Sequence, residues 1–114
     1  MTQPIRKWDV WLADLNPQRG AEPGKVRPVV VVQTDLLNGR HPSTVVCPLT
    51  TQVHPHAQFM RVHLRRGEAG LTRASDVIVD QIRAIDNTRL IPRLGTISAR
   101  SRAILDRNIG VLLQ

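Results

Sequence analysis

An arginine at the start of a valine-rich run is the residue in this chain best suited to bind a phosphate. A polar, glycine-rich stretch, residues 16–25, precedes Arg27, and Pro28 follows it directly. Proline holds the preceding residue in extended geometry and is tolerated at the first position of a strand. Arg27 should therefore project its guanidinium from a rigid base toward a phosphate. The alternative is an ion pair between Arg27 and Glu22 across the loop.

A second candidate is a hydroxyl-rich strand end. The apolar run 45–49 ends in Thr50, Thr51 and Gln52. A threonine hydroxyl can donate to or accept from a phosphate oxygen or a ribose hydroxyl. The alternative is that Thr50 only caps the end of its strand.

A third polar strand end follows the apolar run 77–79. Gln81 could read a base edge and Arg83 could hold a phosphate. An ion pair between Asp80 and Arg83 at a solvated strand end is equally compatible with these residues.

Other chemistries find little support in the sequence. Gly20 and Gly24-Lys25 do not form a nucleotide-binding P-loop, because Val26 stands where Ser or Thr is required. The only close histidine pair, His54 and His56, is split by a proline and has no nearby carboxylate. We therefore expect no metal and no cofactor, and no local Ser-His-Asp or Cys-His motif is evident.

The net charge of +7 favours a polyanionic partner such as nucleic acid. Of the 16 cationic residues 14 are arginines, whose planar fork suits phosphate. An arginine-rich proteome would give the same balance. The single cysteine, Cys47, predicts a buried side chain in a reducing compartment. With no signal-peptide or membrane-spanning run, we expect a soluble cytoplasmic protein.

The surrounding pattern predicts the elements that position these residues. Short β-branched and alternating runs predict strands, and loops rich in Gly and Pro separate them. After residue 98 the period changes, with Ser98 as helix cap and one apolar face. We expect a mainly β single domain over residues 1–114, a curved barrel-like sheet with a C-terminal α-helix. The expected strands are 9–14, 28–33, 44–49, 59–64, 76–80 and 94–97, and the helix covers 98–113.

Five short blocks occur in order along the chain. They are Asp9-Val10-Trp11, Asp14-Leu15-Asn16-Pro17, residues 20–31, Pro48-Leu49-Thr50-Thr51 and residues 80–86. Together they closely resemble the MazF/PemK toxins of type II toxin–antitoxin systems, over roughly residues 7–113. The Gly-x-Glu-x-Gly-x-x-Arg-Pro pattern of residues 20–28 is fairly specific.

This resemblance implies an SH3-like barrel of the CcdB/PemK type that forms a homodimer. It implies sequence-specific cleavage of single-stranded RNA without metal, and inhibition by a MazE-like antitoxin. Attack by the 2′-hydroxyl would leave a 2′,3′-cyclic phosphate and a 5′-hydroxyl. Arg27 and Thr50 carry over as the catalytic pair, and Glu22 and Gln81 as residues of the active-site region. We expect further RNA contacts from the polar residues beside them: Arg19, Lys25, Thr51, Gln52 and Arg83.

The chain departs from one branch of this family at a single position, and two other functions are compatible with such a fold. Ile78 stands where the Kid/PemK branch has a catalytic arginine, so the chain follows the MazF pattern. A CcdB-like gyrase inhibitor would share the fold, but such poisons use a tryptophan near the C-terminus, and residues 110–114 have none. A non-catalytic RNA-binding barrel is the second alternative, although only three aromatic residues are available for base stacking.

Overall fold

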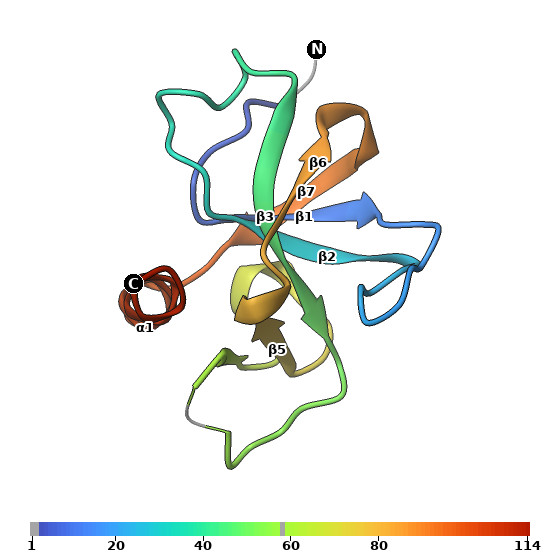
Figure 1. Ribbon diagram of the computed structural model, residues 1–114. Coiled ribbons are helices and arrows are strands. Elements are labelled where there is room, and N and C mark those ends of the chain that lie inside the picture. The colour runs from blue at the N-terminus through green and yellow to red at the C-terminus, as the bar shows by residue number, and fades with distance from the viewer. Residues whose placement is uncertain (1–2, 58) are drawn as a thin grey trace.

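The computed structural model describes residues 3–57 and 59–114, and its strands form one antiparallel sheet that curls around an aliphatic core (Figure 1). Along the sheet the order is β4-β5-β3-β2-β1-β7, and β6 pairs with the first half of β3. The strands are β1 (Asp9–Asp14), β2 (Val26–Val31), β3 (Ser43–Thr50), β4 (Arg61–Leu64), β5 (Ser75–Ile78), β6 (Arg83–Asp86) and β7 (Leu90–Thr96). One α-helix, α1 (Ala99–Leu112), and three 3-10 turns, η1 (Glu68–Gly70), η2 (Val79–Gln81) and η3 (Asn87–Arg89), complete the described structure.

Strand β3 changes its neighbours along its length, and this bends the sheet. Its first half pairs with β6, its middle pairs with β2, and its last two residues pair with β5. Pairing with β2 stops at Val29 opposite Pro48, although both strands continue beyond that point. The two strands therefore diverge there, and a fork opens between them.

The core is aliphatic, as the composition predicts. Alternate residues of β2 face opposite sides, so Val30 packs in one cluster and Val29 and Val31 in another. Cys47 is fully buried in the first cluster, which confirms its prediction as a small hydrophobic residue. Of the three aromatic side chains only Trp11 is buried, while Phe59 is 68% exposed.

Two glycines allow the ends of the sheet to meet. Turn η1, between β4 and β5, lies against β7 at the opposite end of the strand order. A Cβ atom on Gly70 would lie 2.2 Å from the Leu94 carbonyl oxygen, and one on Gly95 would lie 2.6 Å from the Ala69 carbonyl carbon. Only residues without a side chain permit this backbone contact, which brings the sheet close to a barrel.

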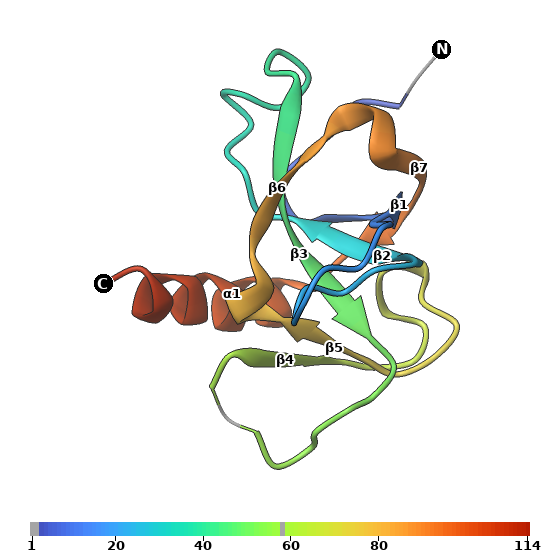
Figure 2. The same ribbon diagram turned by 45° about the vertical axis from the view of Figure 1, so that its right-hand side comes forward.

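The predicted helix is confirmed. Ser98 caps it, since its hydroxyl accepts a hydrogen bond from the Ser101 N–H at 3.2 Å. Leu105 is fully buried, and Ile104, Ile109 and Leu112 pack against the same core cluster, as their spacing predicts. The helix covers the β4–β5 end of the sheet (Figure 2).

The six predicted strands are all found in the predicted order, but a seventh strand, β6, was not predicted. The strand expected at 59–64 begins only at Arg61, because Met60 has a φ of +62° and Phe59 faces solvent. The strand expected at 76–80 ends at Ile78, where the chain turns into η2. Strand β2 starts two residues earlier than expected, so Pro28 is its third residue, and β7 starts at Leu90.

Two glycine substitutions should have opposite effects on the free energy of unfolding. Gly110 lies in α1 with open space around its Cβ position, so Gly110→Ala should stabilise the protein by about 0.5–1 kcal/mol. Gly95→Ala should destabilise it by about 1–3 kcal/mol, because the methyl group meets backbone. Denaturant titrations of both variants test this, and a Gly95→Ala protein as stable as wild type would contradict the proposed closure.

Candidate functional site

A cleft of about 480 Å³ opens at the fork between β2 and β3. It brings together five of the residues singled out from the sequence: Lys25, Arg27, Thr50, Thr51 and Gln52. The other residues that line it are Pro23, Val26, Pro28, Leu49, Arg61, Ser75 and Ile78.

The guanidinium of Arg27 bridges the fork. Its Nε donates to the Gly24 carbonyl at 2.9 Å, and its Nη1 donates to the Leu49 carbonyl at 3.2 Å. Two of the five N–H donors of an arginine are thus engaged with backbone, and the side chain is partly buried. The alternative considered for Arg27, an ion pair with Glu22, is not formed, because Glu22 pairs with Arg83 instead, at 3.8 Å.

Thr50 is the last residue of β3, one residue beyond the carbonyl that Arg27 contacts. Its Oγ1 accepts a hydrogen bond from the Gln52 N–H at 3.1 Å. This bond uses an acceptor position and leaves the hydroxyl hydrogen available to a ligand in the cleft. Thr50 therefore caps its strand and can also donate into the cleft.

The loop before β2 reaches the cleft because it folds tightly. A Cβ atom on Gly24 would lie 2.5 Å from the Gln18 Cβ, so no other residue fits at position 24 without a shift. Lys25 has a φ of +68°, and its N–H donates to Asn16 Oδ1 at 2.8 Å. These contacts set the position of the Gly24 carbonyl that receives Arg27.

A second cleft of about 440 Å³ adjoins the first and shares Pro23, Arg61 and Ile78 with it. Gln81, which lies in η2, lines this second cleft rather than the first. The remaining predicted residues lie outside both clefts. Glu22 and Arg83 form the ion pair described above, so Arg83 does not form the alternative pair with Asp80. Arg19 and Glu22 form a backbone bridge in the loop.

Sequence reasoning missed a charged cluster beside the clefts. The Asp76 carboxylate, in β5, is fully buried. It accepts hydrogen bonds from the His54 N–H at 2.8 Å, from Arg61 Nη1 at 3.1 Å and from His63 Nδ1 at 2.6 Å. The alternation of β4 could have shown that Arg61 and His63 share a face, but the partner strand's register could not be read from the sequence.

The Cys47 thiol is not a reactive nucleophile at neutral pH. Burial raises the pKa of the Cys47 thiol to about 12, so it is protonated at neutral pH. Within residues 3–57 and 59–114, no group of three or more His, Cys, Asp or Glu side chains is arranged to hold a metal ion.

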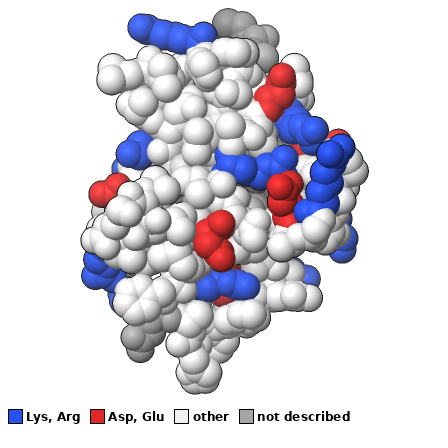
Figure 3. Space-filling view, in the orientation of Figure 1, with Lys and Arg blue, Asp and Glu red and all other residues white. Residues whose placement is uncertain are grey.

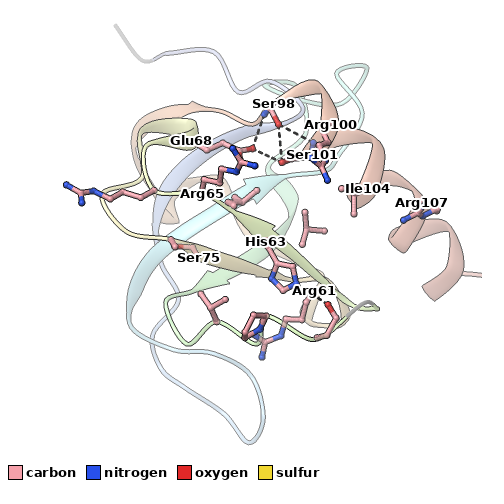
Figure 4. A pocket seen from close by; sticks show the side chains of 17 residues that line it. Arg61, His63, Arg65, Glu68, Ser75, Ser98, Arg100, Ser101, Ile104 and Arg107 are labelled. Atoms are coloured by element: carbon pink, nitrogen blue, oxygen red, sulfur yellow. Dashed lines mark hydrogen bonds between the residues drawn. The ribbon is translucent and has the colours of Figure 1, made fainter.

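A larger cavity of about 1050 Å³ lies between β4 and α1 (Figure 4). Glu68, Ser98 and Ser101 lie at one end of it, away from His63 and Arg61, and are hydrogen-bonded to one another. Burial alone would raise the pKa of Glu68, but the hydrogen bonds from Ser101 and Ser98 bring it below its ordinary value. An ionised Glu68 thus stabilises the start of α1 through its hydrogen bonds to Ser98 and Ser101. We place the candidate site at the 480 Å³ cleft, whose wall includes both Arg27 and Thr50.

Positive charge forms no single continuous patch on the face of the molecule that Figure 3 shows. Figure 3 shows Lys and Arg in separate groups with acidic side chains between them. Net charge alone does not locate a binding site, so the clefts are defined by their geometry.

Among residues 3–57 and 59–114, none of the helices has the length and apolar character needed to span a membrane.

The strongly curved antiparallel sheet with one C-terminal helix is similar to the fold of several solved MazF structures. MazF (Form-I) from Deinococcus radiodurans superposes with a TM-score of 0.84 at 23% identity, over 98% of each chain. The Mycobacterium tuberculosis toxin MazF-mt6 gives 0.75 at 24% identity, over 92% of this chain and 95% of that one. The MazE-MazF (Form-II) structure from D. radiodurans gives 0.76 at 24% identity, over 96% and 95%.

Sequence comparison defines the family. The family model for the PemK-like, MazF-like toxin of type II toxin-antitoxin systems matches residues 6–113. "Endoribonuclease MazF" from Staphylococcus saprophyticus is 31% identical over 109 residues, which are 96% of this chain and 91% of that protein. The protein of the same name from Staphylococcus epidermidis is 33% identical over the same shares. The chain therefore belongs to the PemK/MazF toxin family, as its sequence blocks predicted.

His63 should make stability depend on pH. Its hydrogen bond to Asp76 raises its pKa above the ordinary 6.5 in the folded protein. A raised folded pKa stabilises the protein fully below the unfolded pKa, and this contribution is lost as pH rises through the folded pKa. The free energy of unfolding lost in His63→Gln should thus be larger at pH 5.5 than at pH 8.5. Urea titrations at both pH values measure it, with His41→Gln, an exposed loop histidine, as control. Equal losses at both pH values would contradict the ion pair.

Proposed function

We propose that this protein is a sequence-specific endoribonuclease toxin that cleaves single-stranded RNA in the cytoplasm without a metal or cofactor. The observation that carries the proposal is that Arg27 and Thr50 line one cleft at the fork of β2 and β3. The family and the two curated relatives named as endoribonucleases support the same activity.

RNA carries its own nucleophile, so the protein needs only to align and stabilise the reaction. The ribose 2′-oxygen attacks the adjacent phosphorus while the bond from phosphorus to the 5′-oxygen breaks. The 2′-hydroxyl loses its proton and the leaving 5′-oxygen gains one. The products are a 2′,3′-cyclic phosphate and a 5′-hydroxyl.

Arg27 would stabilise the charge on the phosphoryl oxygens. Its hydrogen bonds to two backbone carbonyls fix the guanidinium before substrate binds, and preorganised charge is the strongest form of such stabilisation. A guanidinium keeps its proton in proteins and is therefore a poor general base, so we assign Arg27 the electrostatic role. The free hydroxyl hydrogen of Thr50 would donate to a phosphoryl oxygen or orient the attacking hydroxyl.

The rest of the RNA would extend along the polar residues around the two clefts. Lys25, Thr51 and Gln52 would contact it beside the scissile phosphate, and Gln81 would face it from the second cleft. Arg19 and the Glu22–Arg83 pair would contact it at the rim of the loop before β2.

Two partners follow from the same proposal. A MazE-like antitoxin with an acidic, flexible segment would cover the RNA site, and the net charge of +7 favours such a segment. Solved structures similar in fold include MazE-MazF complexes. We also propose a homodimer. Val111, in the last turn of α1, and Leu113, directly after it, are exposed apolar residues that a second copy would cover.

Purified protein should cut a long single-stranded RNA in the presence of EDTA, at one recurrent short sequence. The upstream fragments should end in a 2′,3′-cyclic phosphate, and a DNA copy should bind but stay intact. Mapping the new 5′ ends identifies the sequence at which the RNA is cut. Arg27→Ala should lower the single-turnover rate by at least roughly 10²-fold without changing the fold. Arg40→Gln, an exposed arginine outside both clefts, should cut like wild type. An Arg27→Ala protein as fast as wild type would exclude the proposed site.

The hydroxyl of Thr50 should matter separately. Thr50→Val removes the hydroxyl at nearly constant shape and should lower the single-turnover rate by roughly 10²-fold. Thr50→Ser keeps both the bond to the Gln52 N–H and the free hydrogen, so it should retain most of the activity. Equal rates for the Val and Ser variants would show that the hydroxyl at position 50 takes no part in cleavage.

A further inference from the structure

The Asp76 cluster fixes an arginine where the two clefts meet. Burying a carboxylate is costly unless it is paired and hydrogen-bonded, and Asp76 receives donors from His54, Arg61 and His63. Arg61 Nη1 also donates to the Gln52 carbonyl at 3.1 Å. The guanidinium is therefore held from two sides, by β5 and by the chain just after β3.

The remaining donors of Arg61 are available to a ligand. Both described side-chain hydrogen bonds of Arg61 come from Nη1, so Nε and Nη2, with three N–H groups, are not used within the described residues. The side chain is 19% exposed. Its carboxylate partner, by contrast, is fully buried and accessible to no ligand.

The position of Arg61 places these donors on the path between the clefts. Arg61 lines the cleft that holds Arg27 and Thr50, and it lines the cleft that holds Gln81. A single strand that occupies both clefts must pass over their shared wall, which consists of Pro23, Arg61 and Ile78. Arg61 is the only charged residue of that wall.

We propose that Arg61 binds a phosphate of the RNA next to the scissile one, and that Asp76 is the residue that positions it. The proposal rests on the proposed function, since it takes single-stranded RNA as the ligand. A planar guanidinium with free N–H groups on one side is suited to two phosphate oxygens at once. Arg61 is thus assigned to substrate binding, and Asp76 affects that binding by holding Arg61 in place.

The salt dependence of binding separates a phosphate contact from a structural role. The probe is a mixed-sequence single-stranded RNA, fully 2′-O-methylated so that it cannot be cut. For single strands the logarithm of the binding constant falls with the logarithm of salt concentration by about 0.7 per phosphate neutralised. Arg61→Gln should reduce the steepness of that slope by about 0.7, and Arg61→Lys should restore it. Arg40→Gln makes the same substitution at an exposed arginine outside both clefts and should leave the slope unchanged.

Each result decides the proposal. A wild-type slope in folded Arg61→Gln overturns it, as does a slope that Arg61→Lys fails to restore. Arg61→Gln leaves the buried Asp76 carboxylate with fewer partners and so threatens the fold. If circular dichroism shows that this variant is unfolded, the slope is measured with the double variant Arg61→Gln/Asp76→Asn instead. RNA cleavage by the wild-type protein tests the proposed function separately. If cleavage occurs while the Arg61 slope is unchanged, only the role of Arg61 fails.

Discussion

The contact between Arg27 and the carbonyl of Leu49 is the interaction on which the candidate site depends. Strands β2 and β3 diverge beyond Val29 and Pro48, and the guanidinium spans the gap that this leaves. The same contact ties the last turn of the loop before β2 to the end of β3, because Arg27 also donates to Gly24. An opening between two strands thus becomes a cleft with a fixed cation at its wall.

Several features of the sequence serve this arrangement. Strand β3 leaves β2 because its last residues pair with β5, and that pairing places Asp76 opposite Thr50. Gly24 permits the loop to fold against Gln18, which sets one of the two carbonyls that hold Arg27. Fold and site are therefore linked through strand pairing, and the chemistry is concentrated where that pairing changes.

The sequence alone predicted most strands and the helix, because both follow from the local periodicity of apolar residues. Ser98 marked the start of the helix, and the order of the elements indicated the fold class. The short strand β6 was missed, since Arg83–Asp86 lacks an apolar alternation that marks it. Arg27 and Thr50 were found through their polar positions beside strand ends. Arg61 and Asp76 were not identified from the sequence. Their contact depends on the register of β4 with β5, which no local pattern specifies.

A crystal structure of the protein with a 2′-O-methylated RNA tests the central claim most directly. If the Arg27 guanidinium is the fixed cation of the site, a phosphate should lie within hydrogen-bond distance of its free N–H groups and of Thr50 Oγ1. The bonds from Arg27 to the Gly24 and Leu49 carbonyls should persist in the complex. An RNA bound elsewhere on the molecule, with the cleft at the β2–β3 fork empty, would contradict it.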